Sequence, residues 1–266
     1  MKDRVDAQIR EALRAPIDGW NFSWLEGRAS EARPPWSYRD VVATAAAEAR
    51  RVLDIDTGGG EFLASVAPFS ATIVATEGHP PNVPTAARRL APLGISVVHA
   101  ASAPDNVDQE RTAEDDRSTL PFVSDAFDLV VDRHSSYWPS EVHRVLSPGS
   151  RFITQQRGEA GRVGSSWAEL FERPSHPHER FTLSFAVEQL KEAGFEILRA
   201  EEADTPMTFR DLAGVVYYLR LVPWAVARFD PVRDRGFLVS IARKLESDGA
   251  VVVAGDQFLI DALRAG

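Results

Sequence analysis

The sequence predicts an α/β fold: a doubly wound, mostly parallel sheet that an antiparallel strand closes. A buried strand beginning at Arg51 leads into three consecutive glycines at 58–60, and residues 61–67 then have helical spacing. The next apolar strand, residues 71–76, ends on Glu77. Strand-like and helical runs continue to alternate along the chain, which is the pattern of βαβ units. Glycines at such a turn let a ligand approach the backbone where a side chain would block it.

The segments before this strand predict an N-terminal aromatic cap, residues 1–40, ahead of a main domain of residues 41–266. Residues 1–15 have apolar positions at helical spacing, and Pro16 ends the run. The stretch from there to Tyr38 is rich in aromatic and turn-forming residues. It is therefore either a lid over a ligand or a cover for the core beneath it. An alanine-rich helix then leads into the first strand.

Hydrophobic periodicity predicts the remaining elements of the main domain and a helical extension from about residue 203. Residues 101–119 are polar and acidic without periodicity, and they predict an extended loop. The elements expected after Glu77 are a helix at 86–90, strands at 95–100 and from Phe127, a helix from Glu141 with a strand through Ile153, a helix and strand at 185–198, helices at 209–227 and 237–245, and closing strands at 251–253 and 257–260.

Composition restricts the classes of function. A chain of 266 residues suits one domain with an appended cap. The absence of cysteine excludes disulfides, a thiolate nucleophile and cysteine-ligated metals. A net charge of -9 disfavours nucleic acid and favours a small-molecule substrate. The charged N-terminus differs from a signal peptide, and the most apolar segment, 212–227, is interrupted by Arg220 and Pro223. We therefore expect a cytoplasmic protein without membrane attachment.

The spacing of the glycine turn separates two classes of adenosine-containing ligand. A dinucleotide site has the pattern G-x-G-x-x-G, which this chain lacks. Here acids and glycines alternate as Asp54-x-Asp56-x-Gly58-x-Gly60. This run resembles the D-x-G-x-G-x-G signature of class I S-adenosylmethionine-dependent methyltransferases, with Asp56 in place of the first glycine. The carboxylate of Asp56 could pair with the ammonium group of such a ligand.

Two further runs resemble this family in the expected order. Residues 120–134 contain Leu-Pro-Phe, a turn and Phe-Asp-Leu-Val, which is similar to the fourth strand of the widespread type 11 group. Residues 141–153 resemble E-x-x-R-V-L-x-P-G-G, with Ser150 in place of the second glycine. The resemblance covers residues 40–200. It implies a Rossmann-like fold, S-adenosylmethionine as cofactor and S-adenosylhomocysteine as product.

The resemblance also implies a cofactor site at the carboxyl ends of the first strands. Asp54 would orient the glycine loop or meet the methionine end through water, and Glu77 would accept hydrogen bonds from the ribose hydroxyls. An acid before the Leu-Pro-Phe run would contact the adenine amine; Glu114, Asp115 and Asp116 compete for this role, and we select Asp116. The predicted cofactor-binding residues are Asp54, Asp56, Thr57, Gly58, Gly60, Glu77, Gly78, Asp116 and Arg133.

His134 is the predicted catalytic residue because it directly follows the fourth strand. Ligands of open α/β sheets bind beyond the carboxyl ends of the strands, so this loop would face the transferable methyl group. A histidine with its ordinary pKa could deprotonate a hydroxyl or an amine at neutral pH, and the alternative is a structural histidine. Tyr137, the second predicted catalytic residue, would either orient the acceptor or pack.

Substrate binding is predicted for residues at the mouth of the sheet. Trp24, Trp36 and Tyr38 come from the aromatic segment, and Gln155 lies at the tip of the fifth strand. His176 and His178 could suggest a metal. Nearby prolines and the absence of cysteine favour a solvated turn instead, so we predict no metal.

The sequence thus predicts a methyltransferase that acts on oxygen or nitrogen of a small-molecule acceptor, with an intermediate of secondary metabolism as one candidate. An RNA-base methyltransferase is the first alternative, and arginines at 151, 157, 162 and 173 beside the cleft would favour it. A second alternative is a binding protein that has lost catalysis, because Asp56 replaces a glycine. An NAD-dependent enzyme fits least, since the glycine spacing is wrong for a pyrophosphate. Oligomeric state is left open.

Overall fold

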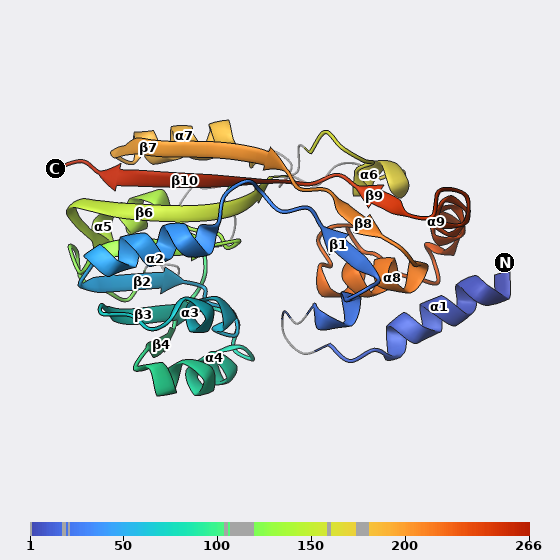
Figure 1. Ribbon diagram of the computed structural model, residues 1–266, viewed down its shortest axis with the longest axis horizontal. Coiled ribbons are helices and arrows are strands. Elements are labelled where there is room, and N and C mark those ends of the chain that lie inside the picture. The colour runs from blue at the N-terminus through green and yellow to red at the C-terminus, as the bar shows by residue number, and fades with distance from the viewer. Residues whose placement is uncertain are drawn as a thin grey trace. The chain divides into compact units, whose positions relative to one another are not determined.

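The computed structural model describes residues 2–17, 20, 22–103, 106, 120–158, 161–173 and 181–266 (Figure 1). The chain divides into two compact units, each assembled from three segments. One, called here the sheet unit, comprises residues 35–157, 180–202 and 257–266. The other, called the helical unit, comprises residues 1–34, 158–179 and 203–256. The predicted N-terminal cap and C-terminal extension fall largely in this second unit.

The sheet unit contains the predicted alternation of strands and helices. Ser37 caps the helix Tyr38–Glu48 by accepting a hydrogen bond from the Asp40 amide, and Thr182 caps the helix Leu183–Glu192 by accepting one from the Phe185 amide. The elements are α2 (Tyr38–Glu48), β2 (Arg51–Ile55), α3 (Glu61–Val66), β3 (Thr72–Glu77), α4 (Val83–Leu90), the 3-10 turn η2 (Ala91–Leu93), β4 (Ser96–His99), β5 (Phe127–Arg133), α5 (Pro139–Val145), β6 (Leu146–Gly158), α7 (Leu183–Glu192), β7 (Phe195–Asp204) and β10 (Asp256–Arg264).

These strands form a seven-stranded sheet in the order β4-β3-β2-β5-β6-β10-β7. The pairs β3–β4, β2–β3, β2–β5 and β5–β6 are parallel, and Leu53 lies opposite both Val74 and Val130. In Figure 1 the arrow of β10 runs opposite to that of β7, so the last strand closes the sheet in the antiparallel sense. The predicted doubly wound, mostly parallel sheet is confirmed.

The core of the sheet unit explains why the central strands are so apolar. In β2 and β5, residues on both faces are buried, as expected for parallel strands covered on each side by helices. Residues of β2, β5 and β6 share one hydrophobic cluster with residues of α5 and α7. On the opposite side α2 packs against α3 and β5, and Figure 1 shows α2 in front of the sheet.

The helical unit has its own small sheet, of which the sequence predicted only the strand at 251–253, there as a closing strand. Its elements are α1 (Lys2–Arg14), the 3-10 turn η1 (Ser23–Leu25), β1 (Ala29–Glu31), α6 (Trp167–Leu170), β8 (Met207–Phe209), α8 (Leu212–Leu221), α9 (Arg235–Asp248) and β9 (Val251–Val253). Strands β1, β8 and β9 pair antiparallel around Phe209. The other two strands, β1 and β8, have only three residues each, which is too short to show a clear alternation in the sequence.

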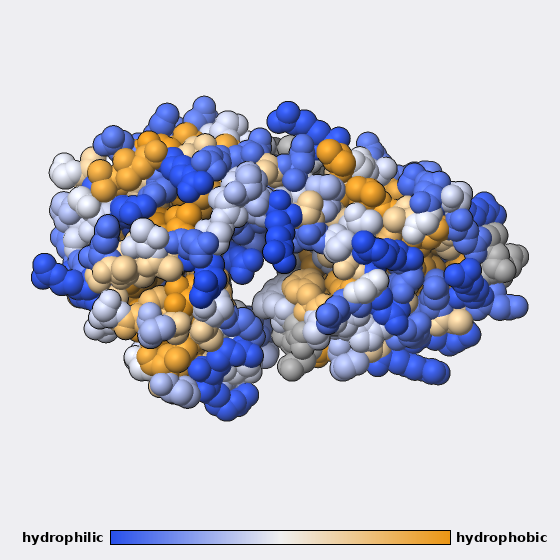
Figure 2. Space-filling model, viewed as in Figure 1, coloured by the Kyte–Doolittle hydropathy of each residue, from blue (hydrophilic) through white to orange (hydrophobic). Residues whose placement is uncertain are grey.

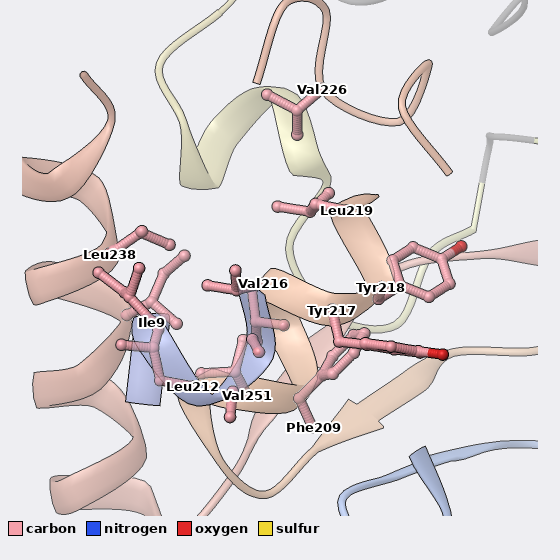
Figure 3. Packing of buried hydrophobic residues seen from close by; sticks show 14 of the residues in the cluster. Ile9, Phe209, Leu212, Val216, Tyr217, Tyr218, Leu219, Val226, Leu238 and Val251 are labelled. Atoms are coloured by element: carbon pink, nitrogen blue, oxygen red, sulfur yellow. The ribbon is translucent and has the colours of Figure 1, made fainter. Parts of the chain in front are cut away.

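Helix α8 is the centre of this unit. Nine of its ten residues are buried, and Figure 3 shows Val216 and Leu219 among side chains from α1, α9 and the small sheet. The helix is shorter than predicted because Phe209 belongs to β8 and Asp211 caps the helix through the Gly214 amide. Hydrophilic side chains cover most of the visible face of α1 (Figure 2).

Within the described ranges, no helix combines the length and apolar character needed to cross a membrane.

Candidate active site

The candidate site lies where the strand order reverses. The chain runs from β2 outward to β3 and β4 and then returns to β5 on the other side of β2. In open α/β sheets, ligands bind in the crevice beyond the carboxyl ends of the strands at such a switch point. A small pocket opens here, lined by Ile55, Asp56, Thr76, residues 101–103, Leu120, residues 136–138, Glu141 and Val142.

The glycine turn after β2 uses backbone conformations that favour glycine. Gly58 and Gly60 have φ angles of 63° and 80°, and Asp56 has a φ of 51°. For a residue with a Cβ atom, the left-handed region costs roughly 1–2 kcal/mol. A Cβ atom at Gly60 would also lie 2.8 Å from the Leu90 side chain, so this close helix contact requires glycine. The Thr57 amide donates to the Thr76 carbonyl at 2.9 Å, which ties the turn to β3.

Asp56 connects the tips of three strands, and this explains how the chain tolerates an aspartate there. Its Oδ1 accepts a hydrogen bond from the Gly78 amide at 3.0 Å. Its Oδ2 accepts from the Ser135 hydroxyl at 2.6 Å. Its own amide donates to the Thr76 hydroxyl at 3.2 Å. The carboxylate therefore offsets the strain of its backbone with bonds that join the ends of β2, β3 and β5.

Three more acids surround this position, and each has a raised pKa. Burial raises the pKa of Asp54 to about 7, and the charges of Asp56 and Glu77 add to the shift. Burial, followed by the charges of Asp56 and Asp54, raises the pKa of Asp132 well above its usual range. Among the described residues, Asp54 Oδ2 and Asp132 Oδ2 are buried without a hydrogen-bond partner. The crevice thus holds buried carboxyl groups whose ionisation is costly unless a cation lies beside them.

Glu77 and Gly78 lie where the resemblance expects the ribose contacts. Glu77 is 4% exposed, and one of its oxygens accepts a hydrogen bond from the His79 amide at 2.7 Å. Its pKa is raised, first by burial and then by the charge of Asp56. A Cβ atom at Gly78 would lie 2.1 Å from the Ser102 hydroxyl, so only glycine fits between β3 and the loop after β4.

His134 lies at the tip of β5 in a left-handed conformation, with a φ of 62°. Its amide donates to the Gln155 carbonyl at 2.9 Å, and its Nε2 lies 3.4 Å from Gln155 Nε2. Desolvation, followed by the charges of Arg157 and Arg133, lowers the pKa of His134. His134 is exposed, and the positive charges of Arg157 and Arg133 disfavour a second proton on its ring. Non-glycine residues with positive φ concentrate at functional sites, and Asp56 and His134 both belong to this crevice.

The predicted aromatic contacts are mostly turned into the protein. Tyr38 is 5% exposed, and its hydroxyl donates to the Asp132 carbonyl at 2.8 Å. Tyr137 is 2% exposed and packs edge-on against Phe152, so its placement favours the packing alternative. Trp36 is also buried and donates its indole N–H to Gln155 Oε1 at 2.9 Å. Burial raises the pKa of both tyrosines, so neither is a phenolate at neutral pH.

The remaining predicted residues make other contacts or lie outside the described residues. Trp24 belongs to the helical unit, where it packs on Tyr217 with a ring separation of 4.6 Å. The Arg133 guanidinium lies 5.6 Å from the centre of the Phe62 ring. The acids Glu114, Asp115 and Asp116 and the histidines His176 and His178 lie outside the described residues. Within the described part, no group of three or more histidines and acids is arranged to hold a metal ion.

Sequence reasoning missed two residues of this crevice. The sequence indicates Asp132 only as part of the fourth strand, yet its carboxylate accepts hydrogen bonds from Gln156 Nε2 at 2.5 Å and the Thr154 hydroxyl at 3.3 Å. Ser135 was passed over as a neighbour of His134, and it supplies the hydroxyl that binds Asp56. An acid closing an otherwise apolar strand was the available signal for Asp132. Ser135 carried none, because its role depends on the aspartate at position 56.

Comparison with known proteins supports the fold. No protein-family model and no curated protein sequence matches the chain. Among solved structures, a candidate methyltransferase from Bacillus halodurans is similar at a TM-score of 0.56 and 18% identity, over 85% of this chain and 98% of the other. The YcgJ protein from Bacillus subtilis gives 0.54 and 16%, over 86% and 98%. The (4+2)-cyclase SpnF gives 0.52 and 17%, over 100% and 94%.

These similarities extend over most of each chain. At such low identity they establish a shared fold and leave the activity to be tested. SpnF illustrates this, because a protein described as a cyclase shares the architecture. The chain has a Rossmann-like α/β fold, which it shares with a candidate methyltransferase.

Proposed function

We propose that this protein is an S-adenosylmethionine-dependent methyltransferase that acts on oxygen or nitrogen of a small-molecule acceptor. The observation that carries the proposal is the pair of buried, incompletely hydrogen-bonded carboxyl groups in the crevice. Asp54 and Asp132 are buried with raised pKa values, and each leaves one carboxylate oxygen without a partner among the described residues. A ligand with positive charge would relieve both costs, and S-adenosylmethionine carries an ammonium and a sulfonium group.

The residues around the crevice fit this cofactor better than a dinucleotide. The pyrophosphate of NAD would bring negative charge next to Asp54 and Glu77, whose pKa values the charge of Asp56 already raises. Asp54 and Glu77 would hold the cofactor, with Asp116 and Arg133 as further predicted contacts. When bound, S-adenosylmethionine supplies an electrophilic methyl group. The chain's own residues then need only bind, orient and exclude water.

The RNA alternative has less support. Arg151 is paired with the buried carboxylate of Asp261, and Arg173 is paired with Asp234. Two of the four arginines that would favour RNA are therefore bound to carboxylates, which lowers the positive charge they offer to phosphates. The overall charge of -9 also favours a small acceptor.

Calorimetric titration tests the proposal. S-adenosylmethionine and S-adenosylhomocysteine should bind with micromolar or tighter affinity, and NAD should not. A matched variant, Asp54→Asn, should weaken the binding of S-adenosylmethionine because it removes one negative charge. NAD binding, or binding of none of the three, would contradict the proposal.

Turnover decides between an enzyme and a binding protein. Release of S-adenosylhomocysteine in the presence of a small hydroxyl- or amine-bearing acceptor would support the methyltransferase. The hydrogen bonds of Asp56 favour the non-catalytic alternative. Both of its carboxylate oxygens already accept hydrogen bonds, from Gly78 and Ser135. Tight cofactor binding without turnover over a broad acceptor series would favour that alternative.

A further inference from the structure

A chain of three side chains ends on His134 at the carboxyl ends of β5 and β6. The Trp36 indole N–H donates to Gln155 Oε1 at 2.9 Å, and Gln155 Nε2 lies 3.4 Å from His134 Nε2. Trp36 is 8% exposed and Gln155 is 3% exposed, whereas His134 is exposed. The first two residues are therefore held inside the sheet unit, and only the imidazole at the end of the chain reaches solvent.

The direction of these hydrogen bonds follows from the groups involved. An indole N–H can only donate, so the Gln155 side chain must turn its oxygen toward Trp36. The amide nitrogen then faces His134, and an amide nitrogen can also only donate. His134 Nε2 must therefore accept. An accepting Nε2 carries no proton, so the neutral ring has its proton on Nδ1.

The backbone and the neighbouring charges also favour a neutral His134 ring that faces Gln155. Arg133 is paired with Gln155 in the β5–β6 register, and the His134 amide donates to the Gln155 carbonyl at 2.9 Å. Both residues are thus fixed relative to each other before their side chains meet. The charged groups that act on the imidazole are Arg133 and Arg157, and positive charge disfavours a second proton on the ring.

We propose that Trp36 and Gln155 are positioning residues that hold His134 as the neutral Nδ1–H tautomer, so that His134 meets an acceptor substrate as a hydrogen-bond donor. The Nε2 lone pair, which a general base would use, faces the Gln155 amide. Nδ1–H is then the group offered to a ligand, and it suits an acceptor with a carbonyl or hydroxyl oxygen near the methylated atom. Only the link to an acceptor rests on the proposed function; the tautomer does not.

Nitrogen-15 NMR of the imidazole tests this directly, without cofactor or substrate. In the wild type, His134 should give the pattern of a neutral ring protonated on Nδ1. Gln155→Glu replaces the donating amide with an acceptor of the same shape. We expect the proton to move to Nε2 and the pKa of His134 to rise by about 1–2 pH units. Trp36→Phe removes the indole N–H and should give a mixture of tautomers, because the amide is then free to turn.

Two controls separate this effect from a general disturbance. Gln189→Glu adds the same charge on α7, where the side chain donates to the Asn106 carbonyl, and should leave the His134 pattern unchanged. His143, which packs against Phe195, provides an internal reference in every spectrum. An Nε2–H pattern in the wild type would overturn the proposal, and so would an unchanged pattern in Gln155→Glu. If Trp36→Phe does not fold, Gln155→Glu decides alone. A failed cofactor titration would affect only the proposed function.

Discussion

Asp234 in the helical unit and the acids of the crevice in the sheet unit have opposite environments. In the helical unit, burial alone would raise the pKa of Asp234, but hydrogen bonds from Asp230 and Arg233 and the charge of Arg173 lower it. In the sheet unit, the pKa values of Asp54, Asp132 and Glu77 are all raised. Paired acids stabilise the fold in which they sit, whereas buried acids without a cation cost stability. The second kind is expected where a site is kept ready for a ligand.

The largest expected effect comes from breaking a pair in the helical unit. Asp234 is 2% exposed and accepts a hydrogen bond from Arg173 Nη2 at 2.5 Å. Arg173→Met should lower the free energy of unfolding by about 3 kcal/mol at pH 7, because it leaves a buried charge with weaker partners. Because the folded pKa of Asp234 is lowered, the loss should shrink as the pH falls through that folded pKa. Urea unfolding at several pH values measures this.

Arg39→Met is the matched control for this substitution. Arg39 and Asp40 are both exposed and lie 3.7 Å apart, so their pair should contribute less than about 1 kcal/mol. Equal losses of stability in Arg173→Met and Arg39→Met would show that burial does not make the first ion pair stronger than the second.

The second-largest expected effect is an increase in the free energy of unfolding. Asp54→Asn removes a buried carboxylate whose pKa is raised from 3.8 to about 7. The ionised form is the unfavourable one in the folded state, so the cost is absent at pH 4, grows as the pH rises to 7 and stays constant above. We expect the variant to be more stable than the wild type by roughly 2–4 kcal/mol at pH 8 and equal to it at pH 4. Urea unfolding at the two pH values checks this. Lower stability at pH 8 would show that Asp54 has a structural partner.

Glu77→Ala tests whether an acid of the sheet unit with a raised pKa binds the cofactor. If Glu77 holds the ribose, the variant should lose roughly 1–3 kcal/mol of cofactor affinity, because hydroxyls are left unpaired. Calorimetric titration with S-adenosylhomocysteine measures the loss, and the exposed Glu188→Ala on α7 is the control. An affinity equal to that of the wild type would remove Glu77 from the site.

The smallest effect concerns the bond between Ser135 and Asp56. Ser135→Ala removes one hydrogen bond to a carboxylate and should cost about 1 kcal/mol of stability. Urea unfolding of the single variants and of the double variant with Asp56→Asn measures the coupling between the two side chains. A coupling near zero would show that the bond joining the strand tips contributes little.

Most elements of the sheet unit could be predicted because the sequence patterns that indicate them are local. Apolar runs at β2 and β5 and the glycines between β2 and α3 each appear within a few residues. The antiparallel sheet of the helical unit could not be predicted, because Ala29–Glu31 pairs with residues about 180 positions away and is too short to show alternation. The contacts of Asp56 were hidden for the same reason, since Ser135 and Gly78 reach it only through the fold.

The interleaving of the chain has a consequence for how such a protein can be modified. Because each unit is built from three segments, the chain passes between them after residues 34, 157, 179, 202 and 256. Three of these points lie within β6, β7 and β10. Replacing the helical unit as a cassette would therefore need five splice junctions, some of which cut strands in mid-course. New specificity is more accessible through point substitutions than through recombination of whole modules.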